Sequence, residues 1–276
     1  MNLLQAILLG VVQGLTEFLP ISSSGHLVIA GKLLETGTQA GGPVREVVAH
    51  LGTLLAVFLF FRRPLGRLIS YGMAGGWLAT RRQGLRAAWW EAPDGRLIVC
   101  IAAATIPTGL IGVGFQKTLE EAFQSPHAAG AGLLATSALL ALALWRRDKG
   151  RNDRSIGLWI ALGVGIAQGV AILPGVSRSG ATIVAGLLMG LRREQAFEFS
   201  FLASIPAILG ASVLELAGAP WAGSWLGSAP FVALAAAAFA AGWAALSALR
   251  PLVSRGQIGW FALYCLPLGL FALLAL

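Results

Sequence analysis

The sequence predicts an all-helical polytopic membrane protein with an inverted-topology repeat, six full transmembrane helices and two re-entrant hairpins made of broken helices. Three observations predict it. Of the 276 residues, 57% are hydrophobic and only 12% are charged, about half of the roughly 25% typical of a soluble domain. Long apolar runs recur along the whole chain. Two of these runs are interrupted by Pro, Gly and Ser, and they match each other in sequence.

The full crossings are assigned to uninterrupted apolar runs of about 17 to 25 residues, the length that spans the hydrocarbon core. Six runs qualify: 45–61, 96–115, 128–145, 198–218, 230–249 and 257–276. No Lys or Arg precedes Lys32, so we expect no cleavable signal peptide, and the first segment stays in the mature protein. Cys100 and Cys265 both lie in apolar runs, which predicts inert packing residues rather than a disulfide or a metal site.

The loops that join the crossings alternate in charge. The loop after the first crossing carries six arginines, whereas the loop at 116–127 sets one Lys against two Glu. The positive-inside rule makes the former cytoplasmic and the latter external. The basic 146–154 loop, the uncharged 219–229 loop and the basic 250–256 loop continue the alternation. Orientation and attraction to anionic lipid therefore explain the net charge of +8, and nucleic acid is not needed to explain it.

An internal duplication relates the two interrupted segments. Residues 10–31 match residues 165–186 at an offset of 155, and the identical pairs are Gly10/Gly165, Gln13/Gln168, Gly14/Gly169, Ser22/Ser177, Ser24/Ser179, Gly25/Gly180, Ala30/Ala185 and Gly31/Gly186. We therefore expect one membrane domain, 1–276, built from a first repeat at 1–145 and a second at 155–276. The charges of the loops predict that the two copies have opposite orientations in the membrane, as in secondary transporters.

Neither interrupted segment is expected to cross the bilayer. Both ends of 155–191 fall on the cytoplasmic side, which predicts a re-entrant hairpin, and 1–34 is then its counterpart entering from outside. Irregular backbone at this depth must be buried in protein or line a wet cavity. The two breaks should therefore face each other across one polar pocket.

The first break combines several kinds of reactive side chain: Gln13, Glu17, Ser22, Ser23, Ser24 and His26, with Gly25 before the histidine. An i, i+4 spacing puts Gln13 and Glu17 on one helix face. The serines open a half-helix whose free N–H groups and positive dipole end favour a phosphate. Glu46 and His50, also at i, i+4, either support this pocket as a polar pair or reach it, and we favour support.

The second break lacks the acid and the imidazole but brings a guanidinium. Ser177, Arg178 and Ser179 start its half-helix, with Thr182 in the first turn. Arg suits a bidentate phosphate contact, and it occupies the position that Ser23 has in the first copy. Together the breaks supply a nucleophile, a base, a cationic stabiliser and a carboxylate for a divalent cation. Because the chain has no Walker motif, nucleotide energy is not implied.

At these residues the sequence resembles the undecaprenyl-diphosphate phosphatase family associated with bacitracin resistance. The stretch from Gln13 to Glu17 is similar to its Glu/Gln-x-x-x-Glu motif, and it runs into Phe-Leu-Pro-Ile-Ser-Ser-Ser-Gly-His26. The stretch Pro174-Gly-Val-Ser-Arg-Ser-Gly-Ala-Thr182 is similar to its Pro-Gly-x-Ser-Arg-Ser-x-x-Thr motif. The resemblance covers nearly the whole chain.

The resemblance implies hydrolysis of undecaprenyl diphosphate to undecaprenyl phosphate and phosphate, which recycles the carrier lipid for peptidoglycan synthesis. It implies a protein of the bacterial inner membrane, a divalent cation, either Mg²⁺ or Ca²⁺, and a homodimer in at least some members. From the charges of the loops we expect the site to face the periplasmic side. By motif position the catalytic residues are Glu17, Ser23, His26 and Arg178. The assisting and substrate-binding positions are Gln13, Ser22, Ser24, Gly25, Ser177, Ser179 and Thr182. Glu17 and Gln13 would hold the metal.

Two positions depart from the family pattern, because Gln13 stands where relatives have Glu and His50 where the resemblance implies Gln. The mechanistic hypothesis is attack by Ser23, with His26 as base, followed by hydrolysis of a phosphoserine. Direct attack by a water that Glu17 or His26 activates is the alternative, and the three serines of the first break are not separated. A different class of function also stays open: transport or flipping of a lipid phosphate or small anion.

Overall fold

The computed structural model describes residues 1–33, 42–145, 155–218 and 228–276. Helices account for nearly all of these residues, and no strand occurs among them, which confirms the predicted all-helical class. The helices are α1 (Leu3–Phe18), α2 (Ser23–Leu33), α3 (Gly42–Phe60), α4 (Arg62–Ser70), η1 (Tyr71–Gly75), α5 (Gly76–Gln83), η2 (Ala87–Glu91), α6 (Pro93–Gly114), α7 (Gln116–Phe123), α8 (Pro126–Trp145), α9 (Leu158–Val170), α10 (Arg178–Leu188), α11 (Arg193–Gly218), α12 (Ala229–Ser254), η3 (Ile258–Phe261) and α13 (Ala262–Ala275).

The predicted crossings correspond to long apolar helices. Within the described ranges, five helical segments are long and apolar enough to cross a membrane: Pro93–Gly114, Pro126–Leu144, Arg193–Ala217, Ala229–Ser254 and Ile258–Ala275. The sixth predicted crossing, 45–61, falls on α3 except for its last residue, and α3 is long enough to cross only when it is counted together with the bent segment Arg62–Gln83. The chain is therefore a polytopic membrane protein.

The two interrupted segments fold as broken helix pairs, α1 with α2 and α9 with α10. The apolar helices α1 and α9 contain 16 and 13 residues, so each is shorter than a full crossing. Residues 19–22 and 171–177 form the breaks. The breaks follow from the sequence, since Pro20 disfavours helical backbone at Leu19, whose ψ is 142°. The re-entrant path and the inverted orientation stay predictions.

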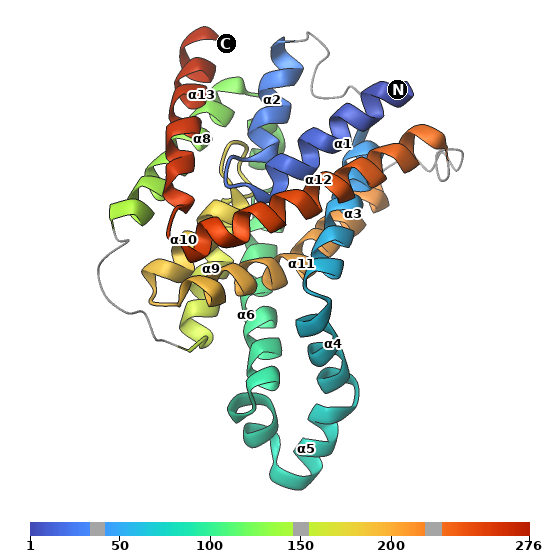
Figure 1. Cartoon of the computed structure of the whole chain (residues 1–276), viewed down its shortest axis with the longest axis vertical. Helices are drawn as coiled ribbons and strands as arrows, with labels where there is room; N and C mark the ends of the chain where they lie inside the picture. The colour runs from blue at the N-terminus through green and yellow to red at the C-terminus, as the bar shows by residue number, and fades with distance from the viewer. Residues whose placement is uncertain (34–41, 146–154, 219–227) are drawn as a thin grey trace.

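Close packing of small residues brings α1 onto α12 (Figure 1). Gly10 and Gly14 lie so near the backbone of α12 that a Cβ at either position would overlap the carbonyl oxygen of Leu234 or Ala238. This is the small-residue packing typical of membrane helices. It places α1, and Glu17 near its end, at a fixed depth along α12.

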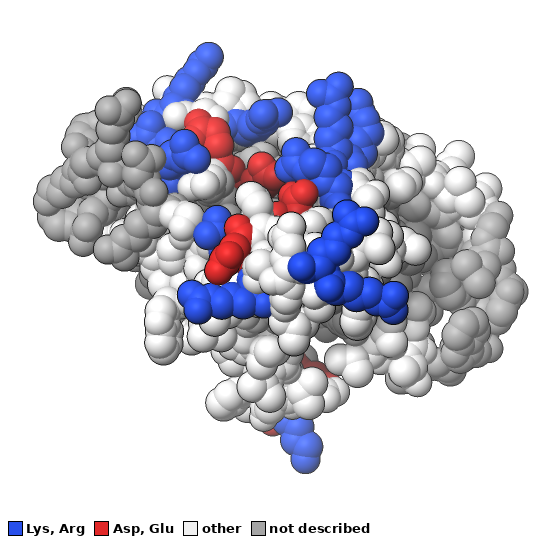
Figure 2. All heavy atoms as spheres, turned by 90° about the horizontal axis from the view of Figure 1, so that it is seen from below, with Lys and Arg blue, Asp and Glu red and all other residues white. Residues whose placement is uncertain are grey.

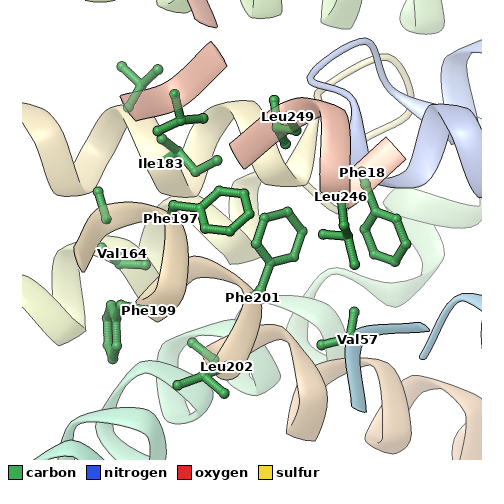
Figure 3. Packing of buried hydrophobic residues seen from close by; sticks show 14 of the residues in the cluster. Phe18, Val57, Val164, Ile183, Phe197, Phe199, Phe201, Leu202, Leu246 and Leu249 are labelled. Carbon is green, nitrogen blue, oxygen red and sulfur yellow. The ribbon is translucent and has the colours of Figure 1, made fainter. Parts of the chain in front are cut away.

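An aromatic cluster underlies the end of α1 (Figure 3). Phe18 meets Phe201 of α11 edge to face, with ring centroids 5.6 Å apart. Phe197 lies 4.9 Å from Phe201, and Phe61 stacks on Phe201 at 5.9 Å. Because Phe18 is fully buried in this cluster, the neighbouring residue Glu17 is held at the break rather than swinging with a frayed helix end.

Candidate active site

The first break begins with an unusual backbone conformation. Ser22 has φ 66°, in the left-handed region that side chains rarely adopt, which lets the chain reverse between Pro20 and α2. Its Oγ accepts a hydrogen bond from the N–H of Gly25 at 3.2 Å and lies 3.1 Å from the Oγ of Ser24. The predicted binding residues Ser22, Ser24 and Gly25 thus form the cap of α2.

The second break repeats this arrangement. The Oγ of Ser177 accepts from the N–H of Gly180 at 3.2 Å and lies 3.3 Å from the Oγ of Ser179. A glycine, Gly175, has the positive φ here, 86°. Matched caps at corresponding positions are what an internal repeat predicts. In both copies the serines are hydrogen-bonded at the start of a half-helix, where further N–H groups face the break.

Buried hydroxyls from other helices hold the second break in place. The N–H of Ser177 donates to Thr136 Oγ1 of α8 at 2.9 Å. Thr182 lies 2.5 Å from the Oγ of Ser200 in α11 and donates to the carbonyl of Arg178 at 2.7 Å. Sequence patterns did not single out Thr136 or Ser200, because isolated hydroxyls in apolar helices carry no spacing signal.

The two breaks meet at Glu17. Arg178 donates from Nη2 to Glu17 Oε1 at 2.5 Å, although the residues are 161 positions apart. The hydroxyl of Ser23 donates to Glu17 Oε2 at 2.7 Å, and the amide of Gln13 donates to the same oxygen at 3.1 Å. The predicted nucleophile, carboxylate and guanidinium therefore occupy one continuous site between α1, α2 and α10.

Both members of the ion pair are largely withdrawn from solvent, since the exposed fractions are 8% for the Glu17 side chain and 15% for Arg178. Burying a charge pair costs desolvation energy that its attraction offsets only in part. Moreover, Nη1 of Arg178 is buried and has no hydrogen-bond partner in the described part of the chain. A phosphate oxygen would satisfy this donor, and unsatisfied buried donors are costly.

The two ring nitrogens of His26 have partners other than Ser23. Its Nδ1 donates to the carbonyl of Ser22 at 2.7 Å, because a carbonyl can only accept, and this leaves Nε2 to accept from the hydroxyl of Tyr264 at 2.7 Å. The two rings are parallel within 6°, with centroids 5.7 Å apart. The role of His26 as base to Ser23 stays a prediction, since the structure gives the Ser23 proton to Glu17.

Tyr264 is the site residue that sequence reasoning missed. It lies in α13, 238 positions from His26, and its neighbours in sequence are apolar. The available signal was a hydroxyl-bearing aromatic within an apolar helix, where polar groups need a partner. That partner could not be named without knowing how α13 packs.

His50 reaches the site rather than only supporting it. Its Nδ1 donates to the backbone carbonyl of Glu46 at 2.9 Å, and its Nε2 lies 3.8 Å from Glu17 Oε2. The preference for a supporting Glu46–His50 side-chain pair is therefore corrected. The hydrogen bond to the preceding turn orients the ring of His50 from α3 toward α1.

Gln168, the counterpart of Gln13 in the second copy, has a structural role. Its Nε2 donates to Thr108 Oγ1 at 3.2 Å and lies 3.4 Å from the carbonyl of Ala203. It thus links α9 to α6 and α11. The two equivalent amides have diverged, one facing the carboxylate and the other cross-linking helices.

The donor set for a divalent cation is small. Within the described residues, no group of three or more His, Cys, Asp or Glu side chains is placed to hold a metal ion. Glu17 offers a carboxylate and Gln13 an amide oxygen. Because Mg²⁺ is commonly bound by one or two carboxylates together with substrate phosphates, these residues fit a cation that arrives with a phosphate ligand.

The fold and the site define a membrane-embedded protein whose carboxylate, hydroxyl and guanidinium converge on an anion-binding half-helix. The family model described as Bacitracin resistance protein BacA matches residues 6–271, and the chain belongs to this family. It is 42% identical over 276 residues to the undecaprenyl-diphosphatase of Desulfatibacillum aliphaticivorans, and the aligned region covers 100% of this chain and 99% of that protein. The undecaprenyl-diphosphatase of Rubrobacter xylanophilus is 44% identical over 216 residues, with 78% and 76% covered. That of Korarchaeum cryptofilum is 40% identical, with 98% of each chain covered.

Proposed function

We propose that this protein is a membrane phosphatase that hydrolyses undecaprenyl diphosphate to undecaprenyl phosphate and phosphate. This activity returns the carrier lipid to peptidoglycan synthesis and confers bacitracin resistance. The observation that carries the proposal is the contact of Glu17 with both Ser23 and Arg178, because it combines a nucleophile, a proton acceptor and a phosphate-binding cation at one point. The names and full-length similarity of the relatives support the choice of substrate.

Binding would use donors that the structure leaves available. The terminal phosphate meets Arg178, whose Nη1 lacks a partner, and the N–H groups at the start of α2. A phosphate on Arg178 competes with Glu17 for the same guanidinium. The carboxylate is then free to take a proton from Ser23.

Chemistry would follow from the 2.7 Å contact between Ser23 Oγ and Glu17 Oε2. The Ser23 oxygen forms a bond to the terminal phosphorus while its proton passes to Glu17, and the bond to the bridging oxygen breaks to release undecaprenyl phosphate. Glu17 returns this proton to the departing undecaprenyl phosphate and is again a carboxylate. Water then attacks the phosphoserine and gives a proton to Glu17, while the bond between phosphorus and Ser23 Oγ breaks. The proton on Glu17 restores the Ser23 hydroxyl, and phosphate leaves. Direct attack by water on the diphosphate is the competing route, and His26 is the other predicted base.

A divalent cation, Mg²⁺ or Ca²⁺, would be held by Glu17 and Gln13 together with phosphate oxygens, and it would neutralise charge on the diphosphate. The family supports placement in the bacterial inner membrane, and the distribution of basic loops supports a site that opens to the periplasmic side. We also propose a homodimer, which rests on the family resemblance alone.

Transport of a lipid phosphate or small anion is the second candidate. It is favoured by the two half-helices that start at one anion site, an arrangement that transporters share. Against it, a carrier has no need for a serine hydroxyl aimed at a carboxylate beside the cation. The two functions can be distinguished in detergent, because hydrolysis needs no membrane between two compartments whereas transport does.

Phosphate release from a prenyl diphosphate by purified protein in detergent, with Mg²⁺ or Ca²⁺ present, tests the proposal. We expect release by the parent and a loss of about 10²-fold or more in Arg178→Ala, because a donor to the developing charge is removed. Arg250→Ala, which removes an exposed arginine elsewhere, is the control. If the parent releases no phosphate with either cation, the phosphatase proposal is wrong, and transport by the same pocket should be measured in vesicles.

A further inference from the structure

A helical hairpin joins α3 to α6 and projects at the lower end of the molecule (Figure 1). It comprises α4, η1 and α5, which run almost continuously from Arg62 to Gln83, and then η2. The helix axis turns by 81° between α3 and this segment. The segment therefore does not continue the axis of α3, and its arginines predict that it lies at the cytoplasmic end of the crossing helices.

Specific contacts show that the hairpin is a built element. The hydroxyl of Tyr71 donates to the carbonyl of Ala88 at 2.5 Å, and the indole N–H of Trp89 donates to Thr80 at 2.9 Å. Gly76 leaves room for the ring of Trp89, with which a Cβ there would overlap. The returning half of the hairpin therefore covers one face of the outgoing half.

An uncovered apolar stripe lies beside this contact. Ile69, Met73 and Trp77 follow an i, i+4, i+8 spacing and are 55%, 79% and 62% exposed. Large apolar side chains on one side of a helix next to a membrane crossing are typical of interfacial amphipathic helices. Tryptophan in particular favours the headgroup level.

Arginines flank the stripe. Arg63, Arg81 and Arg82 are exposed, and none of the three has a hydrogen-bond or ion-pair partner in the described ranges. Figure 2 shows Lys and Arg side chains gathered on the face seen from the end where α4 and α5 lie. An anionic lipid surface complements this charge, and each basic residue near such a surface adds about 1 kcal/mol of attraction.

We propose that the hairpin from Arg62 to Glu91 is an interfacial anchor for anionic lipid. Ile69, Met73 and Trp77 enter the headgroup and upper acyl region, while Arg63 and the Arg81–Arg82 pair contact lipid phosphates. Lipid is favoured over a protein partner because the hairpin connects two membrane helices, α3 and α6, and so lies beside the bilayer in every molecule. This inference is independent of the phosphatase activity.

Cysteine labelling tests the depth of the stripe in the full-length protein. Cys100 and Cys265 are both buried, so Met73→Cys supplies an accessible thiol for an environment-sensitive dye. The matched control is Gln83→Cys, at an exposed polar position on the same hairpin. In nanodiscs that contain phosphatidylglycerol, we expect the dye at 73 to shift to shorter wavelength and to be quenched by shallow spin-labelled lipid, with weaker effects at 83. A dye at 73 that stays as hydrated as the dye at 83 overturns the proposal.

Charge dependence is tested by varying the fraction of phosphatidylglycerol in phosphatidylcholine nanodiscs. In the double variant Arg81→Gln/Arg82→Gln, we expect half of the shift of the dye at 73 to require a higher fraction of phosphatidylglycerol. The apparent affinity of the hairpin for anionic lipid should fall about fivefold for each arginine removed. The control is Arg250→Gln/Arg255→Gln, which removes the same charge elsewhere and should leave the fraction unchanged. An equal shift in pure phosphatidylcholine, or a shift already present in detergent, overturns the proposal in favour of an apolar contact or a protein contact.

Discussion

At the scale of single residues, Glu17 is the point where the functional arguments converge. One of its oxygens accepts from Arg178 and the other from Ser23 and Gln13. The importance of Glu17 and Arg178 could be predicted from sequence, because ionisable residues in apolar segments are expensive and are seldom retained without a function. The contact between Glu17 and Arg178 could be predicted only from the internal repeat, because the broken helices of inverted repeats meet at one site.

Replacement of Glu17 by Gln keeps the shape of the side chain but removes its charge and its capacity to take a proton. We expect phosphate release to fall by about 10²- to 10⁴-fold, the usual contribution of a general base. Glu194→Gln, at an exposed carboxylate outside the site, should retain activity. Wild-type turnover in the Glu17→Gln protein would remove Glu17 from the chemistry and leave His26 as the base.

Tyr264 offers a second test at this scale. Tyr264→Phe deletes the hydroxyl that His26 Nε2 accepts from, and a hydrogen bond of this kind contributes about 1 kcal/mol. If His26 is the base, turnover falls severalfold with KM nearly unchanged; if Glu17 is the only base, turnover stays at the parent value. In a His26→Ala background the same substitution should have no further effect on turnover. Additive losses would show that Tyr264 acts on the fold rather than through His26.

At the scale of elements, the sequence predicts where the helices break better than how the backbone passes through each break. Pro, Gly and Ser mark residues 19–22 and 171–177 as interruptions. The positive φ of Ser22 could not be predicted, because a non-glycine residue adopts it only when surrounding contacts require it. Likewise, the basic loop after the first crossing was not predicted to be helical. Its arginines and glycines interrupt the spacing of apolar residues that would have indicated α4 and α5.

The cap of α10 gives a prediction at this scale. Ser177→Ala removes the side-chain oxygen that accepts from Gly180, and loss of such a cap costs about 1 kcal/mol. We expect a lower unfolding temperature in detergent, measured by the accessibility of Cys100 and Cys265 to a thiol dye during heating. The control is Ser247→Ala, whose hydroxyl only bonds the preceding turn of its own helix. Equal unfolding temperatures for the two variants would contradict a capping role.

At the scale of the whole molecule, close contacts between helices determine whether the two repeats present their residues to each other. Five of the six crossings predicted from hydropathy correspond to single long apolar helices among the described residues. The partners of each helix could not be predicted, because an apolar face that packs on another helix has the same composition as one that faces lipid. Glycine is the exception. A glycine in a membrane helix indicates close approach, but only the structure shows that Gly14 meets α12 while Gly109 meets nothing within 4 Å.

This difference between two glycines provides a test of the global packing. Gly14→Ala would place a methyl group against the backbone of α12, forcing α1 away and moving Glu17, one turn further along, relative to Arg178. We expect a destabilisation of about 1–3 kcal/mol, the usual cost of overpacking, together with a loss of phosphate release.

Gly109→Ala is the matched control, since alanine is the better helix former and the site around Gly109 is open. It should unfold at the same temperature as the parent or slightly above it, with full activity. If Gly14→Ala behaved in the same way, the contact between α1 and α12 would not be what positions the carboxylate. The alignment of the two breaks would then have to come from the aromatic cluster around Phe18 and from the Arg178 ion pair.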